Sequence, residues 1–256
     1  MEYAIAQTGK KTYVKDILRK VILIVFYFLM MDVLSTFLAA LLLLMFPSID
    51  KLLATAIMQY VIYIPILIAC ILLLKNEIIE SINVAKNSQY RKFLGIVGIG
   101  LVSAYGLNIL GGILSSALSS ASNSENEATI ETMFKSSYGM SIVLLVCIIA
   151  PIVEEVVYRG AILRGLEKLK IHPVIALIIS SLIFGFIHVL TAGDYAQVFA
   201  YVFMGLALGY VYQKTKSLVA SVTVHALINT ISTSLQFFLL MMEALKLIPE
   251  GTIWKE

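Results

Sequence analysis

The sequence predicts an all-α fold, a polytopic bundle of membrane helices. Hydrophobic residues make up 60% of the 256 residues and charged residues only 14%, and the mean hydropathy is +0.93. Soluble domains are about 45–50% apolar and about 25% charged, so this composition indicates a membrane protein. The apolar residues also fall in long runs, and no segment alternates like the strands of a membrane barrel.

About seven of these runs are long enough to cross roughly 30 Å of hydrocarbon, with room for an eighth. They cover approximately residues 20–46, 53–74, 93–119, 139–163, 173–190, 195–212 and 217–242. The first run follows the basic segment "KKTYVKDILRK" and is too long for a cleavable signal peptide. We therefore expect it to be retained as the first transmembrane helix.

The basic residues predict the orientation of the bundle. With a cytoplasmic N-terminus, fifteen fall on inner segments: Lys10, Lys11, Lys15, Arg19, Lys20, Lys75, Lys86, Arg91, Lys92, Arg159, Arg164, Lys168, Lys170, Lys214 and Lys216. Four fall on outer segments: Lys51, Lys135, Lys246 and Lys255. Cytoplasmic loops of membrane proteins carry the excess of Lys and Arg, so we expect the N-terminus to be cytoplasmic.

Other partners and modifications find little support in the sequence. The net charge is only +3, and no basic tract is interleaved with aromatic residues, which argues against a nucleic-acid partner. Cys70 and Cys147 both lie within apolar runs, where we expect packed thiols rather than a disulfide framework. Nothing in the sequence fixes the oligomeric state.

Three polar clusters interrupt the apolar runs of the C-terminal half. They are "EEVVYR" (154–159), "FGFIH" (184–188) and "HALIN" (225–229). A charged side chain at the bilayer centre costs about 2.5–3.5 kcal/mol on insertion scales, so such residues face a bundle interior or a wet cavity and usually serve a function. These clusters are the candidate functional residues.

Helix geometry sorts the first cluster. Glu155 and Arg159 are four residues apart with the acid first, the favourable order for an ion pair on one helix face. Glu154 lies about 100° around the helix from Glu155 and can face a different neighbour. We expect the Glu155–Arg159 pair to support a site to which Glu154 contributes directly.

The three clusters are also expected at similar depth. Glu154 lies about 17 residues before the turn near residue 171, and His188 about 17 residues after it. Equal distances from the turn of an antiparallel hairpin place the two side chains at one level. His225 and Asn229 follow the next inner turn by 10–14 residues and approach the same level.

A carboxylate, two imidazoles and a carboxamide in one pocket suit attack of water on an amide. A carboxylate taken out of water holds a proton more strongly, which suits Glu154 as a general base acting with His188. His225 and Asn229 could donate hydrogen bonds to the oxyanion. Alternatively, Glu154, His188 and His225 form a two-histidine, one-carboxylate set for a divalent metal such as Zn²⁺, although no H-E-x-x-H motif is present.

In their order and spacing, the motifs "EEVVYR", "FGFIH" and "HALIN" resemble those of the CAAX protease and bacteriocin-processing (CPBP, or Abi) membrane proteins. The resemblance covers roughly residues 139–240. It implies three regions: N-terminal membrane helices without a recognised motif at 1–138, a CPBP catalytic membrane core at 139–242 and a C-terminal tail at 243–256.

The resemblance implies an intramembrane endopeptidase. Glu154 and His188 would activate water, His225 and Asn229 would stabilise the oxyanion, and Glu155 and Arg159 would support the site. No cofactor would be required, although the family has also been described as metalloproteases. The expected substrate is a peptide or a membrane protein in the bilayer, and relatives process CAAX proteins or act in bacteriocin maturation and self-immunity. We expect the membrane of a prokaryotic cell.

Two other classes of function are consistent with parts of the sequence. A non-catalytic membrane partner that regulates another membrane or signalling protein could keep the polar core for structure alone. A proton-coupled transporter would also use intramembrane acids, but such proteins carry interrupted helices in two similar halves, a pattern that this sequence lacks.

Overall fold

The computed structural model describes residues 2–118, 132–133, 136–190, 193 and 195–248. Within these ranges the chain is almost entirely helical and contains no strand. Seven of its helical segments are long and apolar enough to cross a membrane. They span Thr12–Met45, Lys51–Leu73, Arg91–Ala117, Gly139–Lys168, Pro173–Leu190, Tyr195–Thr215 and Leu218–Glu243. The predicted helical membrane bundle is confirmed, and every predicted run lies within a few residues of one of these segments.

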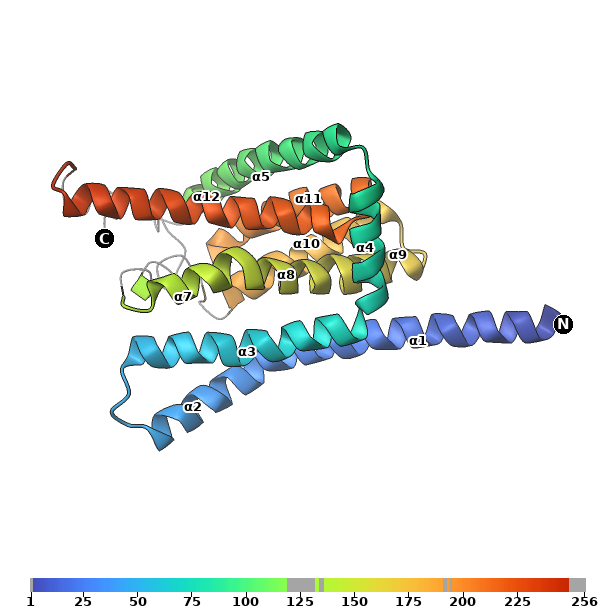
Figure 1. Ribbon diagram of the computed structural model, residues 1–256, viewed down its shortest axis with the longest axis horizontal. Coiled ribbons are helices and arrows are strands. Elements are labelled where there is room, and N and C mark those ends of the chain that lie inside the picture. The colour runs from blue at the N-terminus through green and yellow to red at the C-terminus, as the bar shows by residue number, and fades with distance from the viewer. Residues whose placement is uncertain (1, 119–131, 134–135, 191–192, 194, 249–256) are drawn as a thin grey trace.

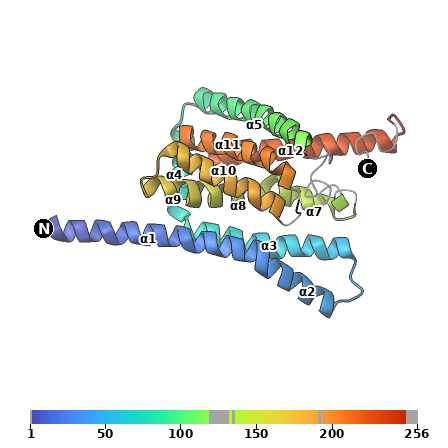
Figure 2. The same cartoon turned by 180° about the vertical axis from the view of Figure 1, so that it is seen from behind.

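The first two spans form an antiparallel pair along one side of the bundle (Figures 1 and 2). The first consists of α1 (Glu2–Phe28), a π-helical turn (Leu29–Leu34) and α2 (Ser35–Met45), and the second is α3 (Lys51–Leu73). Asp50 ends the connection between them, and its side chain caps α3 by accepting a hydrogen bond from the Leu53 amide at 2.8 Å.

The amphipathic helix α4 (Lys75–Asn87) runs across one end of the bundle, nearly perpendicular to the spans (Figure 1). Ser81 of α4 accepts a hydrogen bond from the Val219 amide at 2.9 Å and lies 3.1 Å from the Ser217 hydroxyl, so it fixes the start of α12 (Leu218–Ala244). We call the end of the bundle that α4 crosses the basic end. The helix that follows α4 is α5 (Tyr90–Leu118), which leads to the opposite end.

The basic end also carries a cluster of buried ion pairs, which we call the basic-end cluster. Lys20 of α1 lies 2.8 Å from Asp16 Oδ1 and 2.7 Å from Glu77 Oε1 of α4. Lys168 lies 2.6 Å from the other oxygen of Asp16. Arg19 also lies 3.3 Å from Asp16 Oδ1. The ammonium groups of Lys20 and Lys168 thus tie the first span to α4 and to the end of the fourth span.

The fourth span alternates between α and π geometry. It comprises α7 (Gly139–Leu144), a π segment (Leu145–Ile149), α8 (Ala150–Glu155), a second π segment (Val156–Leu163) and α9 (Arg164–Lys168). Its middle is the most buried part of the bundle, and all eight residues of the second π segment are buried. The fourth span is therefore the central helix of the molecule.

Two further spans pack closely against each other. They are α10 (Pro173–Leu190) and α11 (Val198–Thr215), the latter preceded by a short 3₁₀ turn (Tyr195–Gln197). Gly205 and Gly209, which are four residues apart, both face α10: a Cβ at Gly205 would lie 3.1 Å from Ser181 Cα, and one at Gly209 would overlap Leu177. Small residues let membrane helices approach closely, so this pair accounts for the tight contact between the two helices.

One hydrophobic core runs through the described spans, from Leu23 and Tyr27 of α1 to Val224 and Ile228 of α12. The N-terminal helices thus share one hydrophobic core with the segment from residue 139 onward. Cys70 and Cys147 are free, buried thiols, as predicted. Residues 119–131, Lys135 and the last eight residues of the predicted C-terminal tail lie outside the described residues.

Candidate active site

Glu154 lies near the middle of the central helix, between its two π segments. The preceding Pro151 has no N–H to donate to the helix, and the chain adopts π geometry over Leu145–Ile149, directly before it. The helix is thus distorted into a π segment just ahead of Glu154. Such segments are frequent at functional sites because they re-aim side chains.

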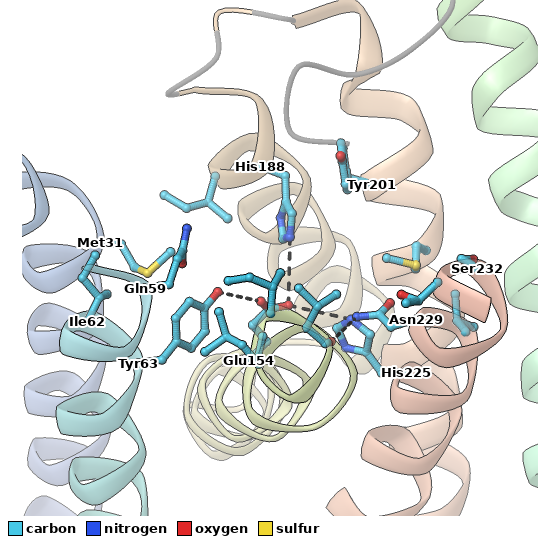
Figure 3. Close-up of a pocket in the computed structure, with 18 of the residues that line it drawn as sticks. Met31, Gln59, Ile62, Tyr63, Glu154, His188, Tyr201, His225, Asn229 and Ser232 are labelled. Atoms are coloured by element: carbon cyan, nitrogen blue, oxygen red, sulfur yellow. Dashed lines mark hydrogen bonds and ion pairs between the residues drawn. The ribbon is translucent and has the colours of Figure 1, made fainter. Parts of the chain in front are cut away.

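The Glu154 carboxylate points into a group of three polar rings (Figure 3). Tyr63 of α3 donates its hydroxyl hydrogen to Glu154 Oε1 at 3.2 Å. The other oxygen, Oε2, lies 4.0 Å from His188 Nε2 and 3.8 Å from His225 Nε2. We call Glu154, His188 and His225 the cavity cluster. The structure therefore brings together the three side chains that the sequence placed at one depth.

The contacts of His188 determine which of its nitrogens carries the proton. Nδ1 lies 2.8 Å from the Phe184 carbonyl oxygen. A carbonyl only accepts, so Nδ1 is the donor, and in the neutral ring Nε2 is left with a free lone pair facing Glu154. The ring is held between Phe184, at 4.5 Å between centroids, and the stacked ring of Tyr201, at 4.6 Å.

Glu155 and Arg159 orient His225. Its Nδ1 lies 3.0 Å from Glu155 Oε1, and Arg159 donates to the same oxygen at 2.9 Å. The second guanidinium nitrogen of Arg159 donates to the Gly205 carbonyl at 2.9 Å, and Glu155 and Arg159 are both at most 1% exposed. The predicted ion pair is present. Because a carboxylate only accepts, it fixes the proton of His225 on Nδ1 and turns Nε2 toward Glu154.

Phe184, the first residue of the "FGFIH" motif, is completely buried at the centre of these groups. Its ring lies 6.0 Å from that of His225 and 5.0 Å from the guanidinium carbon of Arg159, in addition to its contact with His188. An aromatic face can stabilise the cation and pack both imidazoles without adding a competing polar atom. This explains why an aromatic residue precedes the histidine by one helical turn.

Asn229 lies one turn after His225 on α12 and lines the same cavity. Its amide nitrogen donates to the Val146 carbonyl at 2.9 Å, within the first π segment of the central helix. The carboxamide is thus near the cluster and anchored to the helix that carries Glu154. The amide nitrogen carries two hydrogens, so a second one is left for a reacting oxygen while the Val146 bond is kept.

The cluster opens into a cavity of about 450 Å³. Besides the cluster, its wall contains the polar residues Asp32, Ser35, Gln59, Tyr63, Tyr105, Asn108, Asn229, Ser232, Thr233 and Gln236. Apolar residues such as Met31, Ile62 and Met204 complete the lining. A cavity of this size with a few convergent polar groups fits a segment of an extended peptide.

Tyr63 is the contact that sequence reasoning missed. It lies in the N-terminal region, in which no motif was recognised, yet it is 7% exposed and holds one oxygen of Glu154. A faint signal was available: Gln59 and Tyr63 are four residues apart in an otherwise apolar span, and both line the cavity. Tyr158, which follows Glu154 by one turn, instead lies 3.3 Å from the Tyr27 hydroxyl.

The predicted metal alternative can be compared with this geometry. Ligands at about 2.0–2.2 Å around a tetrahedral zinc ion lie roughly 3.3–3.5 Å from one another. The two Nε2 atoms lie 3.8 and 4.0 Å from Glu154 Oε2, which is wider. Among the described residues, no group of three or more His, Cys, Asp or Glu side chains has the arrangement of a metal site.

Residues 136–231, which contain all three motifs, match the family model described as type II CAAX prenyl endopeptidase Rce1-like. The match is to the family that the motifs predicted, for a segment that covers less than half of the chain. The apolar helices indicate an integral membrane protein, and its residues 136–231 are similar to the membrane CAAX-type proteases.

A curated relative supports the same assignment. The "Putative membrane peptidase YdiL" of Bacillus subtilis (strain 168) is 32% identical over 89 residues, which are 35% of this chain and 34% of that protein. The match thus spans about a third of the relative's length. No solved structure matches the chain. Tyr63 lies outside the Rce1-like segment, so the N-terminal helices add to the site a contact that the family match does not cover.

Proposed function

We propose that this protein is an intramembrane endopeptidase in which Glu154 and His188 activate a water molecule. One observation carries the proposal: two imidazole Nε2 atoms, each free to accept a proton, face the same oxygen of a buried carboxylate at 4.0 and 3.8 Å. These separations exceed a hydrogen bond but suit one water that bonds to both partners.

In the proposed reaction, the bridging water gives its proton to Glu154 as its oxygen attacks the carbonyl carbon of the scissile peptide bond. His188 holds the water through its second hydrogen, since its Nε2 can accept. The tetrahedral intermediate then collapses, the C–N bond breaks, and the proton on Glu154 passes to the leaving amine. Tyr63 keeps Oε1 occupied, so that Oε2 is the oxygen aimed at the water.

His225 and Asn229 are proposed to stabilise the oxyanion. With Nδ1–H given to Glu155, His225 can donate from Nε2 only as an imidazolium, and the Glu155 carboxylate can balance that charge. Asn229 contributes the second hydrogen of its amide nitrogen, while the first stays on the Val146 carbonyl. This assigns a role to each polar residue of the three motifs.

The proposed substrate is a peptide or a membrane-protein segment that enters the bilayer, with CAAX-type processing or bacteriocin maturation and self-immunity as the related activities. We further propose a prokaryotic cell membrane, with the N-terminus in the cytoplasm. No step of the proposed chemistry passes through a cofactor.

Comparative peptidomics of cells that carry the wild type or Glu154→Gln tests activity and substrate together. We expect peptides that depend on the wild type to disappear with Glu154→Gln, at equal protein level. Glu80→Gln is the matched control, because Glu80 pairs with Arg164 on the exposed side of α4, far from the cavity. Identical peptide profiles for wild type and Glu154→Gln would instead favour a non-catalytic membrane partner.

A further inference from the structure

The cavity that holds the cluster is displaced toward one end of the bundle. In each span except α12, the lining residues lie at the middle or in the half farther from the basic end, as Gln59 does in α3 and Asn108 in α5. His188 lies only two residues before the end of α10, at the end opposite α4. In α12 the lining begins at His225 and continues away from the basic end to Gln236.

The bundle is closed between the cluster and the basic end. Between Glu154 and the basic end, the central helix carries three side chains that are at most 1% exposed: Tyr158, Arg159 and Leu163. Leu74 and Leu218 pack on Gly160 from the neighbouring helices, at 3.4 and 3.5 Å from the position of a Cβ. Beyond this layer, α4 covers the end of the bundle and the basic-end cluster binds it to α1 (Figure 1).

Toward the opposite end, the cavity wall mixes polar residues with apolar ones such as Ile142 and Leu145, and it reaches exposed residues. Asn108 of α5 and Ser232 of α12 both line the cavity and are exposed, whereas His225, two turns closer to the basic end than Ser232, is 2% exposed. Ser35 and Gln59 add polar side chains to the wall on the side of the first two spans. Among the described residues, these polar side chains form a continuous lining between Glu154 and the exposed rim.

We propose that the site opens on the non-cytoplasmic side of the membrane, and that its substrate is a polypeptide segment presented there, such as an exported peptide or an outer segment of a membrane protein. The side follows from charge, because the closed end is the one that carries the excess of Lys and Arg, which membrane proteins keep in the cytoplasm. The nature of the substrate rests on the proposed peptidase function, but the location of the opening does not.

Cysteine labelling in whole cells tests the location. In a background with Cys70→Ala and Cys147→Ala, which removes both native thiols, single cysteines are placed at the rim of the cavity (Ser232→Cys or Asn108→Cys) or at the basic end (Lys214→Cys, an exposed position). We expect a membrane-impermeant maleimide to label both rim cysteines in intact cells, and Lys214→Cys only after permeabilisation.

The reverse pattern would overturn the proposal, and so would rim cysteines that stay unlabelled even after permeabilisation, because the rim would then not meet water. Repeating the labelling with Glu154→Gln separates this result from catalysis: the pattern should be unchanged in an inactive protein. Once a substrate is known, we expect the impermeant reagent, added outside, to block its cleavage by the Ser232→Cys protein and to spare the cysteine-free protein. Labelling as expected without cleavage would retain the location and reject the peptidase function.

Discussion

The bundle buries ionisable side chains in two places, and their geometry differs. In the basic-end cluster, Lys20, Lys168 and their carboxylate partners meet at 2.6–2.8 Å. In the cavity cluster, Glu154 faces two imidazoles that stop 3.8 and 4.0 Å away. In the first arrangement every carboxylate is in direct contact with an ammonium group, whereas the second leaves room for another molecule beside the Glu154 carboxylate.

The comparison gives a way to distinguish a buried charge that stabilises the fold from one that takes part in a reaction. A buried ion pair is costly unless its hydrogen bonds are satisfied, and removing one partner leaves the other uncompensated. A catalytic group, by contrast, must keep an unsatisfied atom for the reacting molecule. We therefore expect substitutions in the basic-end cluster to lower stability, and substitutions in the cavity cluster to lower activity.

The largest expected effect is on cleavage, from His188→Phe. Phenylalanine keeps a ring between Phe184 and Tyr201 but removes Nε2, the atom proposed to hold the water. General acid–base catalysis contributes about 10²–10⁴-fold to a rate, and it requires the water to be held against Glu154, so we expect a loss of up to that order in kcat of the purified protein, with the melting temperature nearly unchanged. Cleavage close to the wild-type rate would remove His188 from the mechanism.

The largest expected effect on stability comes from Lys20→Met. This change leaves Asp16 and Glu77 buried, with the ammonium between them removed, and breaking such a buried pair typically costs about 3–5 kcal/mol. We expect a clear fall in the melting temperature in detergent, with cleavage per folded molecule retained.

Arg164→Met is the matched control for that change. Arg164 lies near the same end, but its partner Glu80 is 54% exposed, and an exposed pair contributes about 0–1 kcal/mol. Equal destabilisation by the two substitutions would show that burial does not increase the contribution of the basic-end cluster to the free energy of unfolding. A loss of cleavage by folded Lys20→Met protein would contradict the division of roles between the two clusters.

The sequence predicted the spans and the cavity cluster because both depend on local patterns. Span length follows from apolar runs, and the shared depth of Glu154 and His188 follows from their equal distance to one turn. The ion pair of Glu155 with Arg159 follows from helical spacing alone. In these cases the partners are close in sequence or are related by one hairpin.

The remaining contacts depend on how distant helices pack, and no short pattern carries that information. Lys20 and Glu77 are 57 residues apart, and Tyr63 and Glu154 are 91 apart. Tyr63 and its neighbour Tyr60 lie in an apolar span, where either tyrosine is consistent with an ordinary packing residue, and the spacing of Gln59 and Tyr63 does not name Glu154 as the partner. The tautomers of the two histidines likewise emerged only with the Phe184 carbonyl and the Glu155 carboxylate in place.

A smaller effect is expected from Tyr63→Phe, which removes only the hydroxyl on Glu154 Oε1. We expect kcat to fall about tenfold, equivalent to about 1.4 kcal/mol and near the lower range for a hydrogen bond to a charged group, with KM unchanged. Tyr60→Phe is the control on the same helix, since Tyr60 donates to the Ser141 carbonyl and does not touch Glu154. A rise in KM alone, or equal effects of both variants, would contradict the positioning role of Tyr63.

The smallest expected effect is that of a chelator. Because the two Nε2 atoms lie farther from Glu154 Oε2 than ligands around one tetrahedral zinc ion, we expect cleavage by the purified protein to stay within about twofold after treatment with a zinc chelator, since general acid–base chemistry requires only the side chains. A strong loss that added Zn²⁺ restores would show that the cluster contracts around a metal. The carboxylate of the cavity cluster would then have a resident cation as its partner, as the carboxylates of the basic-end cluster have their ammonium groups.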